Sequence, residues 1–223
     1  MQVTARCVLR LSGLVCQGME RAAMGFRVHS GWAACVAVSL AGDTPVVIER
    51  SRVQLVKTFS YKFRQPYHTG ARMSLPRAAA FISRVQRDAE TLAAADLRST
   101  RAKLRKRGFA LVRCGILFAA GRPLPELASI LASHALIHTA DGELFRNALV
   151  RACGLCRLPV VKMKEREIFA RATVALRLDL AKLQRLLIDM GKGIGPPWSQ
   201  DEKLAALVAL VGLVSEGKSP LRN

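Results

Sequence analysis

Residues 109–119 read Phe-Ala-Leu-Val-Arg-Cys-Gly-Ile-Leu-Phe-Ala and are the best candidate for a buried strand in this chain. An apolar run of this length with a single charge is typical of a strand that is covered on both faces of a sheet. Such a strand needs neighbours, so the elements before and after it decide the fold.

Upstream of this strand the pattern predicts two strands and a long helix. Residues 25–40 predict a first strand, and residues 46–56 alternate as its antiparallel partner after a Gly/Pro-containing turn. Residues 57–75 are basic and irregular, which predicts a long loop or a weak third strand. Pro76 suits the first turn of a helix that continues to about residue 107.

Downstream of the buried strand the pattern is mostly helical, with one short strand expected at residues 158–163. The expected helices cover residues 125–138, 141–157, 165–176, 179–190 and 199–214. This order of elements predicts an α/β fold with a mixed sheet and helices packed against it.

The composition is that of a globular protein rather than a disordered basic one, because 51% of the 223 residues are apolar. Residues 1–23 predict a poorly ordered N-terminal extension, and residues 24–223 predict a single α/β domain. No uninterrupted apolar run is long enough to predict a membrane span. We therefore expect a cytoplasmic protein.

Positive charge is concentrated in one quarter of the chain. The formal net charge is +19, and residues 51–107 hold fourteen basic and three acidic residues. A one-sided field of this kind favours an anionic partner, and DNA or RNA is the partner that we expect. The alternative is a structural or assembly protein that uses the charge to dock an acidic partner.

The expected long helix carries a row of arginines. At 100° per residue, six of them fall within about 120° of one another, so they share one helix face. These residues are Arg77, Arg84, Arg87, Arg98, Arg101 and Arg105. Such a face is suited to a phosphate backbone, although a solvated helix face has the same pattern.

The element order resembles the ribonuclease H-like superfamily and, within it, the Holliday-junction resolvases. Those enzymes carry an acidic residue just before an Ala-rich helix near the C-terminus, and Asp201 has that place here, in Pro196-Pro-Trp-Ser-Gln-Asp201-Glu-Lys-Leu-Ala-Ala-Leu207. The resemblance implies a mixed sheet that begins with hairpin strands, and a metal-dependent nuclease that uses Mg²⁺. The Ser30-Gly-Trp32 strand, the His134–His138 segment and the Pro-Pro-Trp ending also resemble a bacterial protein family, to which we attach no function.

The chain departs from the nuclease pattern in the first strand. There the resemblance implies an Asp that binds Mg²⁺, whereas this chain has Arg27-Val-His29 and no carboxylate between residues 24 and 42. One hypothesis is therefore that the protein is a degenerate, non-catalytic member of the superfamily. The other is an Mg²⁺-dependent nuclease with a displaced carboxylate set, for which Glu49, Glu143 and Asp201 are the candidates.

Two short motifs have metal-ligand chemistry but are incomplete. His134 and His138 lie one helical turn apart, which is half of a zinc site. Cys153 and Cys156 form a Cys-x-x-Cys at a helix end, with no second cysteine pair at zinc-finger spacing. The sequence alone thus assigns no cofactor.

Ser199 and Glu202 have the spacing of a capping box at the start of the last helix. This accounts for Glu202 structurally. Asp201 is then either a further acidic residue in the first turn of the helix, or the acidic residue that the resolvase-like pattern places just before the Ala-rich helix.

Overall fold

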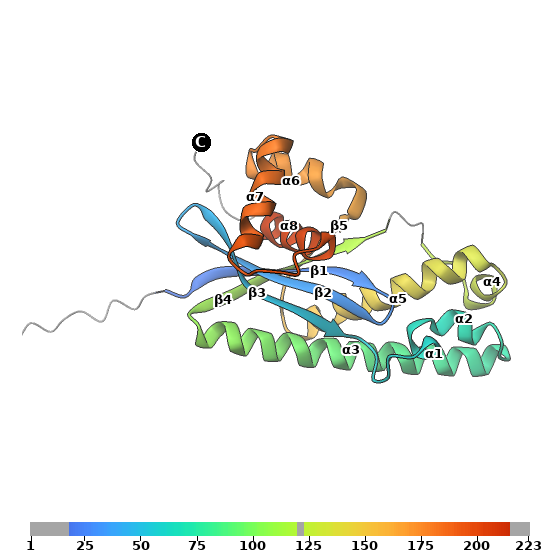
Figure 1. Ribbon diagram of the computed structural model, residues 1–223. Helices are drawn as coiled ribbons and strands as arrows, with labels where there is room; N and C mark the ends of the chain where they lie inside the picture. Colours follow the sequence, from blue (N-terminus) through green and yellow to red (C-terminus); the bar gives the residue numbers. More distant parts are fainter. Residues whose placement is uncertain (1–17, 120–122, 215–223) are drawn as a thin grey trace, which may run out of the picture.

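The computed structural model describes residues 18–119 and 123–214. Five strands and a set of helices alternate along the chain (Figure 1). The elements are β1 (Glu20–His29), β2 (Trp32–Ala41), β3 (Thr44–Gln54), α1 (Tyr61–Arg64), α2 (Pro66–Gly70), α3 (Leu75–Lys106), β4 (Phe109–Phe118), α4 (Leu127–Leu131), α5 (His134–Leu155), β5 (Val160–Lys164), the 3₁₀ helix η1 (Glu165–Glu167), α6 (Ile168–Leu176), α7 (Leu180–Lys192) and α8 (Gln200–Val214).

The strands form one mixed sheet in the order β3-β2-β1-β4-β5. β1 pairs antiparallel with β2, which pairs antiparallel with β3. β1 also pairs parallel with β4, and β4 pairs parallel with β5. The prediction of an α/β fold with a mixed sheet that begins with hairpin strands and has helices packed on it is confirmed.

The N-terminal hairpin corrects the expectation of one strand over residues 25–40. The chain turns back at Ser30-Gly31, where Gly31 has φ +84°, a conformation that glycine adopts without a steric penalty. The apolar residues on either side of the turn hid it in the sequence pattern. β1 also begins at Glu20, so residues 20–23 of the expected extension belong to the sheet; residues 1–17 lie outside the described residues.

Two further expectations about helices need correction. Residues 57–75 contain the short helices α1 and α2 rather than a loop or a strand. The helix expected at residues 125–138 is divided between α4 and the start of α5, and α5 then continues through Gly142 without a break. Glycine costs about 1 kcal/mol in a helix interior, and the buried apolar face of α5 outweighs that cost.

Helices cover both faces of the sheet (Figure 1). α3 and α5 pack on one face, and α8 packs on the other, with α6 against α8 and α7 against both α8 and the edge strand β3. β1 alternates between the layers: Met24 and Phe26 belong to the core under α3 and α5, whereas Ala23 belongs to the core under α8. Gly25 lies on the same side as Ala23.

Glycines let α8 approach the sheet closely. A Cβ at Gly25 would lie 1.8 Å from the carbonyl oxygen of Ala205, and one at Gly115 would lie 2.6 Å from that of Val208. The helix therefore rests on the backbone of β1 and β4, which brings its first turn over the C-terminal half of β1. No helix in the described part of the chain has both the length and the apolarity to cross a lipid bilayer.

Candidate functional site

Arg27 lies two residues after Gly25 in β1, on the face of the sheet that α8 covers. Its Nη2 is 2.9 Å from Oε1 of Glu165, its Nε is 3.3 Å from both oxygens of that carboxylate, and its Nη1 donates to Asp201. The hydrogen bond to Glu165 is the chief cause of a raised Arg27 pKa; Asp201 adds to the effect, and burial opposes it. Three segments far apart in sequence therefore meet around one internal cation.

His29 binds the same carboxylate from the next position on this face of β1. Its Nε2 is 3.0 Å from Oδ2 of Asp201, so both oxygens of Asp201 are engaged. The His29 ring stacks on Trp32 with centroids 4.3 Å apart, and the Arg52 guanidinium lies 3.9 Å from the Trp32 ring centroid. We call Arg27, His29, Glu165 and Asp201 the Arg27 cluster.

The start of α8 sets the position of Asp201. The backbone N–H of Ser199 donates to Oε2 of Glu202 at 2.8 Å, and the N–H of Asp201 donates to Oγ of Ser199 at 3.2 Å. This confirms the capping box. Because Ser199 and Glu202 form the cap, the Asp201 carboxylate is directed to a tertiary contact with β1 instead.

The Arg27 cluster does not fit a magnesium ion. Mg²⁺ prefers six oxygens at about 2.0–2.1 Å, and two-ion nucleases place their ions about 3.5–4 Å apart between several carboxylates. Within the described residues the cluster offers two carboxylates, and both accept hydrogen bonds from Arg27. The guanidinium occupies the side of the carboxylates that a metal ion would need.

A hollow of about 540 Å³ opens beside Glu165 at the C-terminal edge of β4. It is lined by Phe118, Ala119, Arg146, Glu165, Arg166, Phe169, Gln200 and Leu204. The charges that line this hollow are already paired, Arg146 with Glu143 and Arg166 with Glu167, while Glu165 is bound to Arg27. The described residues of the hollow therefore offer no free carboxylate to a cation.

The candidate carboxylates Glu49, Glu143 and Asp201 are bound by three separate sets of basic side chains. Their partners are, in turn, Lys103 with Arg107, Arg146, and Arg27 with His29. In residues 18–119 and 123–214, one group of three side chains has metal-ligand atoms close enough to share an ion, and it contains none of these carboxylates. The structure thus does not bring the displaced set together.

The six arginines predicted on one helix face are all exposed along α3, and we call them the α3 arginine face. None of the six forms an ion pair with an acidic residue in the described part of the chain. Arg101 donates to the carbonyl oxygen of Cys156 at 3.1 Å. Lys103 and Arg107 of the same segment differ from them, because both are bound to Glu49.

One end of this face borders a basic hollow of about 340 Å³. Lys62 of α1 and Arg77 and Arg84 of α3 supply its charges, and Phe81 is part of its wall. Cations from two helices therefore surround a single depression, which is suited to a phosphate group.

The two short motifs have different surroundings. Cys153 and Cys156 lie at the end of α5, as expected, and are free and buried. His134 and His138 share a face of α5, but they are not a lone pair, because His68 of α2 joins them.

Sequence reasoning missed His68 and Glu165. His68 lies in a segment that was expected to be irregular, and Glu165 directly follows the short strand β5. The parallel pairing of β5 with β4 is a signal for Glu165, since the carboxyl ends of parallel strands meet at one edge of a sheet. For His68 no local signal exists, because its partners lie more than sixty residues further along the chain.

No protein-family model and no curated protein matches this chain. Among solved structures, it is similar to RuvC of Thermus thermophilus in complex with a Holliday junction substrate, with 13% identity, a TM-score of 0.47, and coverage of 86% of this chain and 91% of that one. A second structure of Thermus thermophilus RuvC gives 12% identity and a TM-score of 0.46, covering 85% and 92% of the two chains. The yeast mitochondrial Holliday junction resolvase Ydc2 gives 10% identity and a TM-score of 0.46, covering 86% of this chain and 77% of that one. The chain is thus structurally similar to Holliday junction resolvases.

Proposed function

We propose that this protein binds nucleic acid through the α3 arginine face and does not cleave it. The observation that carries the proposal is the row of exposed arginines on α3 with no acidic partner among the described residues. Exposed guanidiniums that no carboxylate neutralises are available to phosphate groups, which they bind in a bidentate manner.

The length of the face suits a duplex. Arg77 and Arg105 are 28 residues apart on one continuous helix, which corresponds to roughly 42 Å at 1.5 Å per residue. Double-stranded DNA carries a phosphate charge about every 1.7 Å along its axis, so a helix of this length lies alongside many phosphates. At one end of the face, Lys62 of α1 adds a further cation beside Arg77 and Arg84.

The Arg27 cluster supports binding without cleavage. Hydrolysis of a phosphodiester by this fold class requires divalent ions held by carboxylates, and here Arg27 neutralises Glu165 and Asp201 from within the chain. A divalent ion would have to displace a guanidinium that makes charge-assisted hydrogen bonds to both carboxylates. The cluster therefore serves as an internal brace between β1, η1 and α8.

The test is a salt titration of binding to labelled duplex DNA, a four-way junction and structured RNA, with and without Mg²⁺. Binding should weaken steeply with salt, because each phosphate contact contributes about 0.9 to the slope of log K against log salt. Changing Arg98, Arg101 and Arg105 together to Glu should lower that slope by about 2.7 and weaken binding at least tenfold.

A matched control changes three exposed cations on the opposite layer, Arg171, Lys182 and Arg185, to Glu. The net charge then changes by the same amount, and binding should change much less. Equal loss in both triple variants would mean that the total charge, rather than the α3 arginine face, attracts the nucleic acid. If none of the three nucleic acids binds, the proposal is wrong, and the charge would instead serve an acidic protein partner. Mg²⁺-dependent cleavage that Asp201→Asn abolishes would overturn the non-catalytic part of the proposal.

A further inference from the structure

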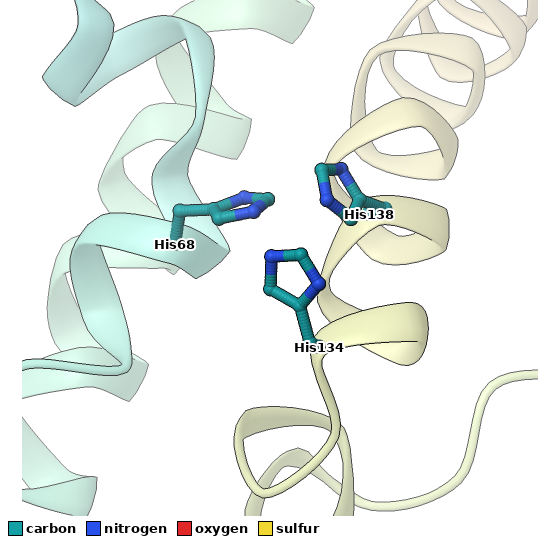
Figure 2. Close-up of side chains that lie close together, drawn as sticks. All are labelled: His68, His134 and His138. Atoms are coloured by element: carbon teal, nitrogen blue, oxygen red, sulfur yellow. The ribbon is translucent and has the colours of Figure 1, made fainter.

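Three of the chain's four histidines lie together where α2 meets the start of α5, and we propose that His68, His134 and His138 bind a zinc ion. We call them the histidine cluster. Figure 2 shows the three rings turned toward one another, His68 from one helix and the other two from a second helix. This inference does not depend on nucleic-acid binding.

The ligand atoms are close to the spacing that zinc requires. One ring nitrogen of each histidine lies within 4.8 Å of the other two. With Zn–N bonds of about 2.0–2.1 Å, tetrahedral geometry places two ligand nitrogens roughly 3.3 Å apart. The ring centroids are separated by 4.4 Å for His68–His138 and His134–His138 and by 5.5 Å for His68–His134, so small side-chain rotations close the remaining gap.

Asp141 orients His68 in the way that carboxylates hydrogen-bonded to metal-bound histidines do in zinc sites. Its Oδ2 lies 2.5 Å from Nδ1 of His68, and its Oδ1 accepts the backbone N–H of Tyr67 at 2.7 Å. The Asp141 side chain is 3% exposed, so its geometry is fixed by the surrounding protein. A hydrogen bond at Nδ1 leaves Nε2 of His68 as the metal-binding nitrogen.

α2 depends on contacts with other helices, because its five residues are too few for a helix to be stable by itself. Its Pro66 and Gly70 are buried, and Tyr67 packs against the main core and against a small core of Ile130, Ile137 and Ala140. The hydrogen bonds of Asp141 to Tyr67 and His68 already join α2 to α5. A metal ion bound by the histidine cluster would add a further link between the two helices, as structural zinc does in other small domains.

The donor set indicates which ion is bound. Three neutral imidazoles are the ligands of zinc and of other late first-row metals, whereas Mg²⁺ and Ca²⁺ require oxygen. His134 and His138 are exposed, so the fourth position of the tetrahedron is open to water. The site is therefore a three-histidine zinc site with one water ligand. The bound zinc ion would hold α2, and α1 before it, against α5.

The experiment measures the zinc content of protein purified without a histidine tag. The protein is stripped with a chelator, supplied with one equivalent of Zn²⁺, desalted and analysed by mass spectrometry of the metal. We expect about one zinc per chain, as for a three-histidine site. His134→Gln and His138→Gln, both at exposed positions, should each lose most of the zinc. His29→Gln is the matched control, because His29 lies outside the histidine cluster, and it should retain the zinc.

Loading the wild-type protein with Co²⁺ gives a readout that needs no variant. Tetrahedral Co²⁺ bound by imidazoles should give visible ligand-field absorption, and one equivalent of Zn²⁺ should abolish it. The proposal is wrong if the folded wild-type protein retains neither metal, or if His29→Gln loses zinc while His138→Gln keeps it.

Discussion

The Arg27 cluster and the histidine cluster each gather metal-ligand residues from distant segments, yet they differ in what balances their charge. In the Arg27 cluster, two carboxylates converge at one edge of the sheet, and the chain supplies a guanidinium to neutralise them. In the histidine cluster, three imidazoles converge with one buried carboxylate behind them. Convergence of ligand residues therefore does not by itself make a metal site. A metal ion can bind only where no basic side chain of the protein already neutralises the ligands, as Arg27 does in the Arg27 cluster.

Replacing the internal cation should have the largest effect. Arg27→Asp would place three carboxylates together without the guanidinium. Leaving a buried charge unpaired costs about 3–5 kcal/mol, and we expect the lower end of that range, about 3 kcal/mol, because the side chains of Glu165 and Asp201 are 42% and 22% exposed. We expect a loss of that size in the free energy of unfolding, measured by urea denaturation in the presence of a chelator. Because the variant would hold three carboxylates together, Mg²⁺ should restore part of the lost free energy of unfolding. The stability of the wild-type protein should not change with Mg²⁺. Equal stability of variant and wild type in chelator would contradict the role of Arg27 as the brace.

Zinc should stabilise the wild-type protein through the histidine cluster. A ligand at a free concentration 100 times its dissociation constant adds about 2.7 kcal/mol to the free energy of unfolding. Urea denaturation with buffered zinc and with chelator measures this difference, which His138→Gln should abolish and Arg27→Asp should leave intact. If the stabilisation by zinc persists in His138→Gln, the ion is bound elsewhere.

Removing one carboxylate of the Arg27 cluster should have a smaller effect than removing the cation. Asp201→Asn leaves Arg27 paired with Glu165, so we expect a loss of about 1–2 kcal/mol, in the range for a hydrogen bond to a charged group. Although Glu165 contributes most to the raised pKa of Arg27, Glu165→Gln should cost less stability. Solvent screens Glu165, whose side chain is 42% exposed, more than Asp201, which is 22% exposed and also binds His29. Thermal unfolding of the two variants side by side provides the ranking. The reverse order would mean that Arg27 depends chiefly on Glu165.

Asp96 should show the smallest effect; no basic side chain in the described part of the chain forms an ion pair with it. It lies half-buried on α3, and among the described residues its Oδ2 has no hydrogen-bond partner. Burial raises its pKa, so the folded state holds the proton to a higher pH than the unfolded state does. Asp96 therefore lowers stability as the pH rises from the ordinary Asp pKa, about 3.9, through the raised value.

Asp96→Asn should accordingly stabilise the protein at pH 7, by up to about 1 kcal/mol, with little difference at pH 3. Urea denaturation at the two pH values measures it. A larger benefit at pH 3 than at pH 7 would show that burial does not set the titration of Asp96.

The fold was largely predictable from the sequence, because periodicity is a local signal. The long helix ending near Arg107, the buried strand from Phe109 and the capping box at Ser199 were all expected within one or two residues. The β1–β2 turn was not, since Ser30-Gly31 is enclosed by apolar residues that continue one strand pattern into the next.

The sites were less predictable because their residues meet only through the fold. The sequence showed that Arg27 replaces a carboxylate, but only the pairing of β5 with β4 and the close approach of α8 at Gly25 bring Glu165 and Asp201 to it. In the same way, His134 and His138 were visible as a helical pair, whereas His68 reaches them through tertiary packing. Helical spacing gives neighbours within one element, and it carries no information about the partner element.

Binding of duplex DNA as a function of salt, in the presence of Mg²⁺, is the direct test of the proposed function, with the wild type compared with the variant in which Arg98, Arg101 and Arg105 are all Glu. We expect a steep salt slope for the wild type, a slope lower by about 2.7 for the variant, and uncleaved DNA throughout. A salt-independent affinity, or cleavage that disappears in Asp201→Asn, would show that the proposed function is wrong.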